Sequence, residues 1–119
     1  MKLIIAGSRG FNNYYFLKEQ VTIFLATLRE PFPEIISGGA SGADTYGEWY
    51  AKERGLKIIR MPANWNKYGR AAGPIRNEEM AKIADACIIF WDGKSAGSRN
   101  MIDMCVKYNL KYCVITTIK

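Results

Sequence analysis

Glycine and serine residues gather in three short segments whose chemistry suits the binding of an anion. The segments are Gly7–Gly10, Ser37–Asp44 and Asp92–Arg99. Glycine lets a backbone N–H group approach a phosphate, serine adds a hydroxyl donor, and a helix that begins after such a segment adds a favourable dipole. Each segment alone is also typical of a tight turn or a helix cap. If the three meet at one edge of a sheet, they predict a site for a nucleotide-sized phosphorylated ligand.

A fourth segment, Pro62–Gly73, is much longer than the ~2–6 residues that usually join a strand to a helix, and long ordered connections are usually functional. Trp65 or Tyr68 in it could lie against a nucleobase. Arg70, and Arg76 just beyond it, offer forked donors for a phosphate or a carboxylate. The alternative is that Trp65 packs against the core while both arginines point to water.

Few residues could carry catalysis. Histidine is absent, which removes the commonest general base and the commonest metal ligand, so we expect neither a metal nor a cofactor. Asp44 stands at the start of a predicted helix, where a carboxylate can cap backbone N–H groups or accept from a ligand hydroxyl. Asp92 is a further candidate, but no pair of carboxylates at a catalytic spacing can be recognised. The candidate catalytic residues are therefore Asp44, Arg76 and Asp92, without assigned roles.

Two familiar phosphate-binding motifs fail when they are tested on these segments. Gly93-Lys94-Ser95 is similar to the end of a P-loop, but Ile88 stands where the first glycine is required. The first segment lacks the G-x-G-x-x-G pattern, and Ser37-Gly38 follow the second strand where an acidic residue should hold a ribose. We expect neither ATP hydrolysis of the P-loop kind nor NAD-dependent redox chemistry.

The elements that must position these segments alternate along the chain. Apolar runs typical of buried strands are each followed by a loop and then by a stretch of helical periodicity. The predicted strands are Lys2–Ala6, Glu34–Ser37, Lys57–Met61, Ala86–Trp91 and Lys111–Thr116. Strands joined by single helices form right-handed βαβ units. The sequence therefore predicts an α/β, Rossmann-like three-layer sandwich, with a mainly parallel five-stranded sheet and helices on both faces.

Four helices are expected between these strands. The first carries an apolar stripe and can be capped by Asn12 or Asn13. The second runs over about 42–54 and stops at Gly55, the third begins at Pro74, and the fourth covers about 97–108. The stripe of the first helix consists of Leu17, Val21, Phe24, Leu25 and Leu28.

Composition bounds the class of protein. With 119 residues, 49% hydrophobic and 24% charged, the chain is expected to form one Rossmann-like domain over 1–119. The longest apolar runs, such as Cys87–Trp91, are too short to span a membrane, so we expect a cytoplasmic protein with no membrane partner. The cysteines, Cys87, Cys105 and Cys113, are read as reduced thiols of the core. The net charge of +6 favours anionic partners, but the charges are spread along the chain.

The motifs, in their order and spacing, resemble the YspA/YpsA-related branch of the SLOG superfamily. The strings that carry the resemblance are Gly7-Ser8-Arg9, Gly38–Asp44, Pro62-Ala63-x-Trp65, Tyr68–Asn77, and Asp92-Gly93 through Gly97-Ser98. The resemblance implies a Rossmann-like fold that binds nucleotides or nucleotide-derived ligands at its Gly-rich edge. Its relatives include cytokinin-activating phosphoribohydrolases, sensor domains for nucleotide signals, and a protein that loads single-stranded DNA.

The chain departs from the enzymes of that superfamily at one decisive position. The phosphoribohydrolases use an arginine, whose place Arg76 can fill, and a glutamate three residues after a Gly-Thr pair. Aligning Gly97-Ser98 with that pair places Met101 where the glutamate should stand. A thioether cannot act as an acid or a base. The site is therefore predicted to bind and is not predicted to catalyse.

We therefore expect binding of a nucleotide or nucleotide-derived phosphorylated small molecule, without a strong catalytic pair. The alternatives are N-glycosidic cleavage of a nucleoside monophosphate by a phosphoribohydrolase, and binding of single-stranded nucleic acid, which the lack of a basic cluster interleaved with aromatics disfavours. Self-association is a further hypothesis, because Tyr14, Tyr15, Trp49 and Tyr50 add aromatic surface to a small domain. The predicted ligand-binding residues are Gly7, Ser8, Arg9, Gly38, Gly39, Ser41, Gly42, Asp44, Trp65, Arg70, Arg76, Asn77, Gly93, Ser95, Gly97 and Ser98.

Overall fold

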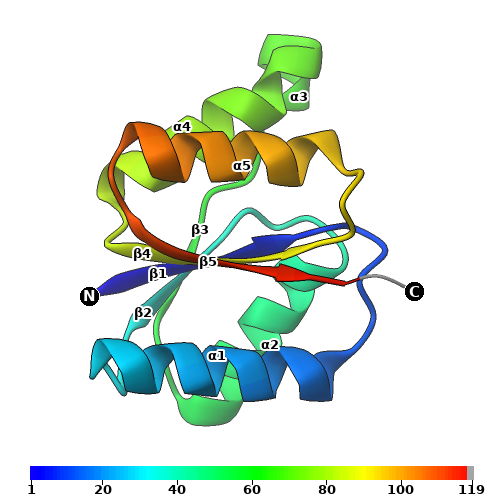
Figure 1. The fold of residues 1–119 in the computed structure, drawn as a ribbon. Coiled ribbons are helices and arrows are strands. Elements are labelled where there is room, and N and C mark those ends of the chain that lie inside the picture. The colour runs from blue at the N-terminus through cyan, green and yellow to red at the C-terminus, as the bar shows by residue number, and fades with distance from the viewer. Residues whose placement is uncertain (118–119) are drawn as a thin grey trace.

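A five-stranded parallel sheet forms the centre of the molecule. The computed structural model describes residues 1–117, and its strands pair in the order β3-β2-β1-β4-β5. The strands are β1 (Lys2–Gly7), β2 (Glu34–Ser37), β3 (Ile58–Arg60), β4 (Ala86–Trp91) and β5 (Lys111–Thr116). The predicted strands are confirmed, and every pairing between them is parallel. All carboxyl ends therefore meet at one edge, on the right in Figure 1.

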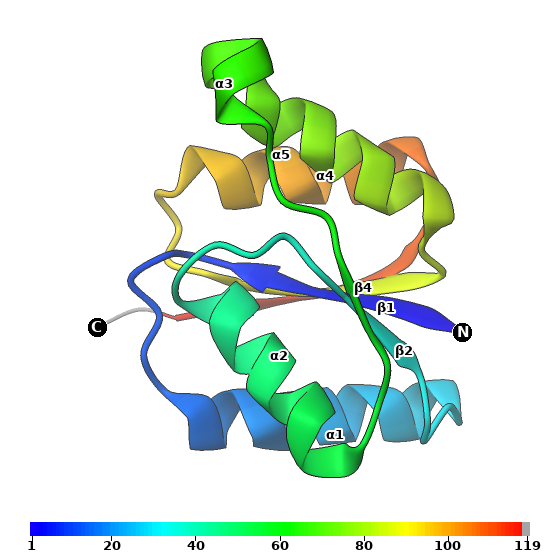
Figure 2. The ribbon, with the colours of Figure 1, turned by 180° about the vertical axis from the view of Figure 1, so that it is seen from behind.

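Helices cover both faces of this sheet. The helices α1 (Tyr14–Leu28) and α2 (Ala43–Arg54) lie on one face, and α4 (Ala72–Ile83) and α5 (Ala96–Lys107) lie on the other (Figures 1 and 2). This is the three-layer, Rossmann-like α/β sandwich that the alternation of strands and helices predicts. None of the helices among residues 1–117 is long and apolar enough to cross a membrane.

Local signals set most helix ends. The side chain of Asn13 accepts a hydrogen bond from Phe16 N at 3.1 Å, so Asn13 and not Asn12 caps α1. Gly55 ends α2 with a φ of 68°, which glycine adopts at little cost. Pro74 is the third residue of α4 and not its first, because the helix already begins at Ala72.

The long connection after β3 differs from the open loop expected there. Trp65–Tyr68 form a short helix, α3, and Gly69–Ala71 add a 3-10 turn, η1. The side chain of Asn64 accepts from Lys67 N at 3.1 Å and so caps α3. Figures 1 and 2 show α3 standing out beyond α4 and α5, above the carboxyl edge.

Two apolar clusters, one on each face of the sheet, make the core. Leu3 and Ile5 of β1 face α1 and α2, whereas Ile4 faces α4 and α5, as the two-residue period of a strand requires. The central strands are therefore apolar on both faces, which is typical of parallel sheets. Cys87 and Cys105 are fully buried free thiols, as predicted, whereas Cys113 is only half-buried.

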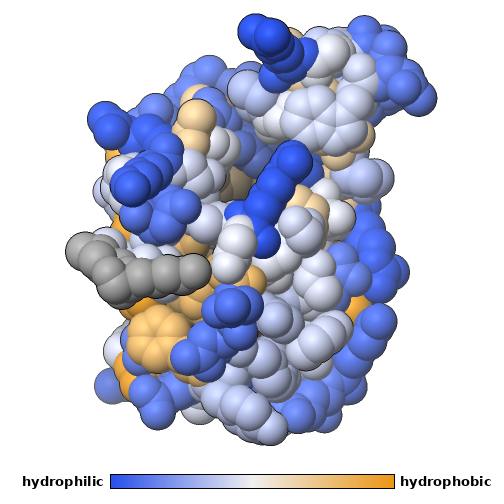
Figure 3. All heavy atoms as spheres, turned by 90° about the vertical axis from the view of Figure 1, so that its right-hand side faces the viewer, coloured by the Kyte–Doolittle hydropathy of each residue, from blue (hydrophilic) through white to orange (hydrophobic). Residues whose placement is uncertain are grey.

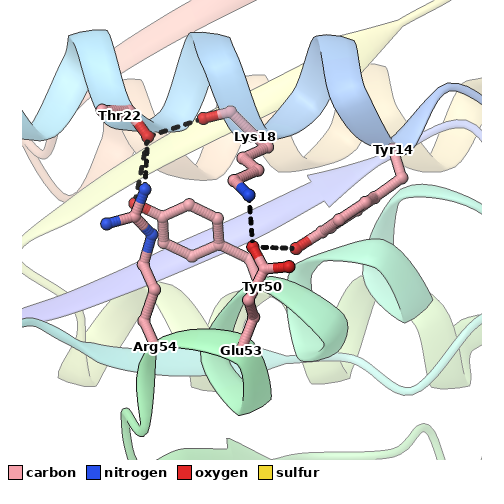
Figure 4. A network of polar contacts seen from close by, with 6 residues as sticks. All are labelled: Tyr14, Lys18, Thr22, Tyr50, Glu53 and Arg54. Carbon is pink, nitrogen blue, oxygen red and sulfur yellow. Dashed lines mark hydrogen bonds and ion pairs between the residues drawn. The ribbon is translucent and has the colours of Figure 1, made fainter.

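Polar contacts fasten α1 to α2 beside the apolar core (Figure 4). Tyr14 donates to Glu53 at 3.2 Å, and the ammonium of Lys18 lies 2.6 Å from the same carboxylate. Burial, reinforced by Glu53, raises the pKa of Tyr14 to about 12, so it remains a neutral donor. The expectation that Tyr50 is a surface aromatic is wrong: it is 1% exposed, with the guanidinium of Arg54 4.7 Å from its ring centre.

Close packing of α2 on β1 yields a stability prediction at Gly47. A Cβ at Gly47 would lie 2.9 Å from Cβ and Cγ2 of Ile5, a branched side chain held in the core. We expect Gly47→Ala to lower the free energy of unfolding by about 1–3 kcal/mol, measured by urea denaturation.

The matched control is Gly97→Ala in α5, where an added Cβ meets nothing within 4 Å. We expect the control to be neutral or to gain up to ~1 kcal/mol from helix propensity. Equal loss in both variants would show that close packing at Gly47 is not the cause.

Candidate functional site

A cavity of about 540 Å³ opens at the carboxyl edge, between the ends of β1 and β4. The chain leaves β1 toward α1 on one face of the sheet, whereas β3 connects to β4 through α4 on the other face. The strand order therefore reverses between β1 and β4, and ligands of open α/β sheets bind at such a point. Figure 3 shows this edge face-on, with the surface hollowed between hydrophilic side chains in its upper half. We call it the anion cavity. Its walls are Ala6–Gly10, Ala40, Asp44, Trp65, Arg70, Gly73, Pro74, Arg76, Asn77, Met80, Asp92, Ser95–Ser98, Asn100 and Met101.

The amino end of α5 forms one wall of the anion cavity. The Ser95 hydroxyl caps this helix by accepting from Ser98 N at 3.4 Å. The Ser98 side chain is 4% exposed, and its hydroxyl oxygen has no hydrogen-bond partner among the described residues. An unsatisfied buried hydroxyl costs about 1–3 kcal/mol, so it marks a place where a polar ligand atom would be favourable.

Arg76 supplies a fixed positive charge on the opposite wall. Its Nη1 donates to Gly38 O at 2.6 Å and its Nε donates to Asn77 Oδ1 at 3.0 Å. Asn77 in turn donates to Gly97 O at 3.3 Å and to Asn100 Oδ1 at 2.9 Å. The guanidinium from α4 is thereby tied both to the loop after β2 and to α5.

Asp44 is the buried carboxyl group of the site, with an exposed fraction of 5%. Burial raises its pKa to about 6, although the N–H of Ala40, which donates to Oδ2 at 3.2 Å, and the charge of Arg76 both oppose the shift. A Cβ at Gly38 would lie 2.8 Å from Asp44 Oδ2 and 2.5 Å from Arg76 Nη1. Only glycine at position 38 therefore leaves room for this pair of charged groups.

Aromatic and cationic side chains frame the rim. The Arg9 guanidinium lies 5.7 Å from the ring centre of Trp65, a cation–π contact. Trp65 is 49% exposed, so it does not plug the connection into the core. The indole contacts α4 at Gly73, where an added Cβ would lie 3.4 Å from Cη2. A flat apolar surface and a cation thus face solvent at the mouth of the cavity.

Most residues expected from the sequence come together here. The ligand-binding candidates that line the cavity are Gly7, Ser8, Arg9, Asp44, Trp65, Arg70, Arg76, Asn77, Ser95, Gly97 and Ser98. Asp92 also lines it, but its Oδ1 accepts from Lys94 N and Ser95 N, both at 2.8 Å, and so holds its own loop together. Among the described residues, no cluster of three or more His, Cys, Asp or Glu side chains could hold a metal.

The candidates Gly38, Gly39, Ser41, Gly42 and Gly93 do not line the cavity. The amide of Gly39 donates to the Ser37 hydroxyl at 3.1 Å, so it is already used within its own loop. A Cβ at Gly42 would lie 2.4 Å from the carbonyl oxygens of Ser8 and Arg9, so this glycine permits close packing against the first loop. Of the segment Ser37–Asp44, only Ala40 and Asp44 therefore line the cavity, and its glycines support the wall from behind.

The cavity also includes residues that sequence reasoning missed. Asn100 lies one helical turn beyond Gly97 and orients Asn77, and Gly10 and Ala40 complete the loops after β1 and β2. Helical spacing from Gly97 could have indicated Asn100. Ala40 lies in the predicted segment Ser37–Asp44 but was not among the predicted ligand-binding residues, and its backbone amide is directed at Asp44.

Comparison with known proteins agrees with this architecture. Residues 1–68 match the model of the YspA, cpYpsA-related SLOG family. The chain belongs to this SLOG family. A relative, the Gene 61 protein of Mycobacterium phage D29, is 31% identical over an alignment of 110 residues, and the match covers 83% of this chain and 83% of that protein.

The SLOG fold is also seen in a solved structure. DNA processing protein A (DprA) from Streptococcus pneumoniae superposes with a TM-score of 0.73 at 19% sequence identity, over 98% of this chain. The matched region is 50% of the DprA chain, so the present chain spans about half of that protein. At this identity the likeness establishes the shared Rossmann-like fold.

The buried Asp44 makes the stability of this SLOG domain depend on pH. Because its pKa is raised from 3.8 to about 6, the folded state holds a proton that the unfolded chain releases, and stability falls as pH rises from about 4 to 6. Above pH 6 the ionised Asp44 carboxylate lowers the free energy of unfolding by ~3 kcal/mol. We expect Asp44→Asn, whose amide oxygen can still accept from Ala40 N, to lack this fall and to be more stable than the wild type at pH 7.

Urea denaturation of both proteins from pH 4 to pH 8 measures the difference. Carboxylates that do not interact with Asp44, such as Glu78 with its lowered pKa, contribute equally to both proteins and cancel in the difference. A difference that stays constant across this range would contradict the raised pKa of Asp44.

Proposed function

We propose that this SLOG domain binds a nucleotide, or a nucleotide-derived phosphorylated small molecule, in the anion cavity. The observation that carries the proposal is the buried Ser98 hydroxyl, which lacks a partner at the amino end of α5. The N–H of Ser98 is capped by the Ser95 hydroxyl, but the N–H groups of the residues before it in the first turn of α5 have no partner within the helix, and the helix dipole favours an anion there. A phosphate oxygen would satisfy both the hydroxyl and these N–H groups.

The charges around the cavity support an anionic ligand. Arg9, Arg70 and Arg76 line it, against the carboxyl groups of Asp44 and Asp92. Asp92 is engaged with its own loop, and burial of Asp44 disfavours its charged form. The local balance is therefore positive, and forked guanidinium donors match the oxygens of a phosphate.

The remaining walls offer contacts for the rest of a nucleotide. The side chains of Asn77 and Asn100 can meet ribose hydroxyls or base edges, and Trp65 presents its ring face at the mouth. The volume of about 540 Å³ is in the range of small-ligand sites. Membership of the SLOG family agrees with a ligand of this class.

One observation favours a second candidate, the hydrolysis of a nucleoside monophosphate to a free base and ribose phosphate. The Asp44 carboxyl, with a pKa of about 6, lines the cavity and could donate a proton to a leaving base. Against this stands Met101, which lies buried in the cavity wall where the phosphoribohydrolases have a glutamate. Release of free base from AMP, CMP and GMP distinguishes the two functions, since a binding module saturates with nucleotide without releasing base.

Titration calorimetry with nucleoside monophosphates tests binding through Ser98. We expect Ser98→Ala to weaken binding by about tenfold or more, because a hydrogen bond to a charged group contributes ~1.5–3 kcal/mol. The free protein should unfold no more easily, or become up to ~1 kcal/mol more stable, because an unsatisfied buried hydroxyl has been removed.

The control is Ser41→Ala, which alters an exposed serine of a neighbouring loop outside the cavity. It should change neither affinity nor stability. Absence of binding by any nucleotide, sugar phosphate or cyclic derivative at millimolar concentration would refute the proposed function.

A further inference from the structure

A second cavity, of about 640 Å³, opens at the same edge of the sheet, on the side of β1 and β4 that faces α1. Rings of Phe11 and Phe16 contribute to its wall, and both pack near Phe90, with ring centres 5.1 and 6.2 Å away. We call it the aromatic cavity. Its walls are Ser8, Gly10, Phe11, Asn12, Asn13, Phe16, Asp92, Lys94, Thr116 and Thr117.

A narrow ridge separates the aromatic cavity from the anion cavity. Ser8, Gly10 and Asp92 line both cavities, so the two lie back to back across the loops after β1 and β4. Ser8 stiffens the ridge: its N donates to Phe90 O at 2.9 Å, and its hydroxyl accepts from Asp92 N at 3.0 Å. A molecule bound in one cavity therefore lies next to the opening of the other.

The two cavities differ in chemistry. The anion cavity is bordered by three arginines and the amino end of α5, whereas the aromatic cavity combines phenylalanine rings with amide and hydroxyl groups of Asn12 and Thr116. Rings and neutral polar groups of this kind suit a nucleobase, which stacks and forms hydrogen bonds at its edges. Lys94, exposed at the aromatic cavity, takes part in none of the ion pairs among the described residues.

We propose that the ligand consists of two nucleotide units joined by a phosphodiester. The first unit places its terminal phosphate at Ser98 and Arg76 in the anion cavity. The second unit places its base in the aromatic cavity, and the linking phosphate crosses the ridge at Gly10 beside Lys94. This inference rests on the proposed function, because the first unit occupies the same site.

The space above the ridge supports this path. A Cβ at Gly10 would meet nothing within 4 Å, so the passage between the cavities is open there. The backbone at Gly10 has no positive φ, so a larger side chain can be introduced without strain. Gly10 is therefore a position where the path can be blocked while the fold is kept.

The test compares binding of AMP, CMP, GMP and UMP with binding of 5′-phosphorylated linear dinucleotides of the same bases, using the full chain in titration calorimetry. We expect a dinucleotide to bind at least ~10-fold more tightly than its mononucleotide, because the second contact becomes intramolecular. Lys94→Gln should weaken dinucleotide binding ~3-fold or more, through loss of a charged contact to the linking phosphate, and leave mononucleotide binding unchanged. Gly10→Leu should abolish the dinucleotide advantage.

Lys111→Gln is the matched control, since Lys111 begins β5 at the opposite edge of the sheet and carries the same charge. It should leave both affinities unchanged. A 5′-phosphorylated twelve-nucleotide single strand distinguishes the source of the ligand: tighter binding of the free dinucleotides indicates a small molecule, and equal binding of the strand indicates nucleic acid. Both results support the shared chemistry of two linked nucleotides.

Two negative results have separate meanings. If mononucleotides bind and depend on Ser98, but dinucleotides bind no more tightly, the proposal of a two-nucleotide ligand is overturned and the proposed function stands. The proposal is overturned equally if Lys94→Gln and Gly10→Leu both leave the dinucleotide advantage unchanged. If neither mononucleotides nor dinucleotides bind, the proposed function itself is refuted.

Discussion

The parallel pairing of β1 with β4 is the constraint on which the candidate site depends. The register sets Gly7 opposite Phe90, so both strands end at the same level, and Ser8 N continues the pairing by donating to Phe90 O. Because the helices after these strands leave on opposite faces of the sheet, no helix covers the gap between the two strand ends. Both cavities lie at that gap, one on each side of the ridge.

The site is assembled at a cost in stability that the rest of the fold offsets. Ser98 leaves a buried hydroxyl unsatisfied, and Asp44 is a carboxyl group that burial makes difficult to ionise. A protein tolerates destabilising groups of this kind when its core supplies enough stability, and here they adjoin the two apolar clusters of the sheet. The proposed binding function would account for two groups that lower the stability of the free protein.

Local patterns sufficed to predict the strands, some of the helix ends and the edge of the sheet where the loops meet. Asn13 caps the start of α1 and Gly55 caps the end of α2, each through contacts within a few residues, so their residue types alone indicate their roles. The function of Gly38 could not be predicted in this way. It depends on Arg76, which is distant in sequence and approaches through the packing of α4. The short helix α3 was missed because four residues carry too little periodicity to distinguish a helix from a loop.

The arrangement of Arg76 and Asp44 couples ligand charge to protonation. Arg76 is held by Gly38 O and Asn77 Oδ1, so its position does not depend on ionisation of Asp44. In the free protein the positive charges of Arg76 and Arg9 lower the pKa of Asp44. A phosphate bound in the anion cavity would offset these charges. The pKa of Asp44 would then rise further, and binding near neutral pH would be accompanied by uptake of a proton. In the proposed complex the carboxyl group would thus adjust its charge to the ligand, so one buried acid would be compatible with an anionic ligand.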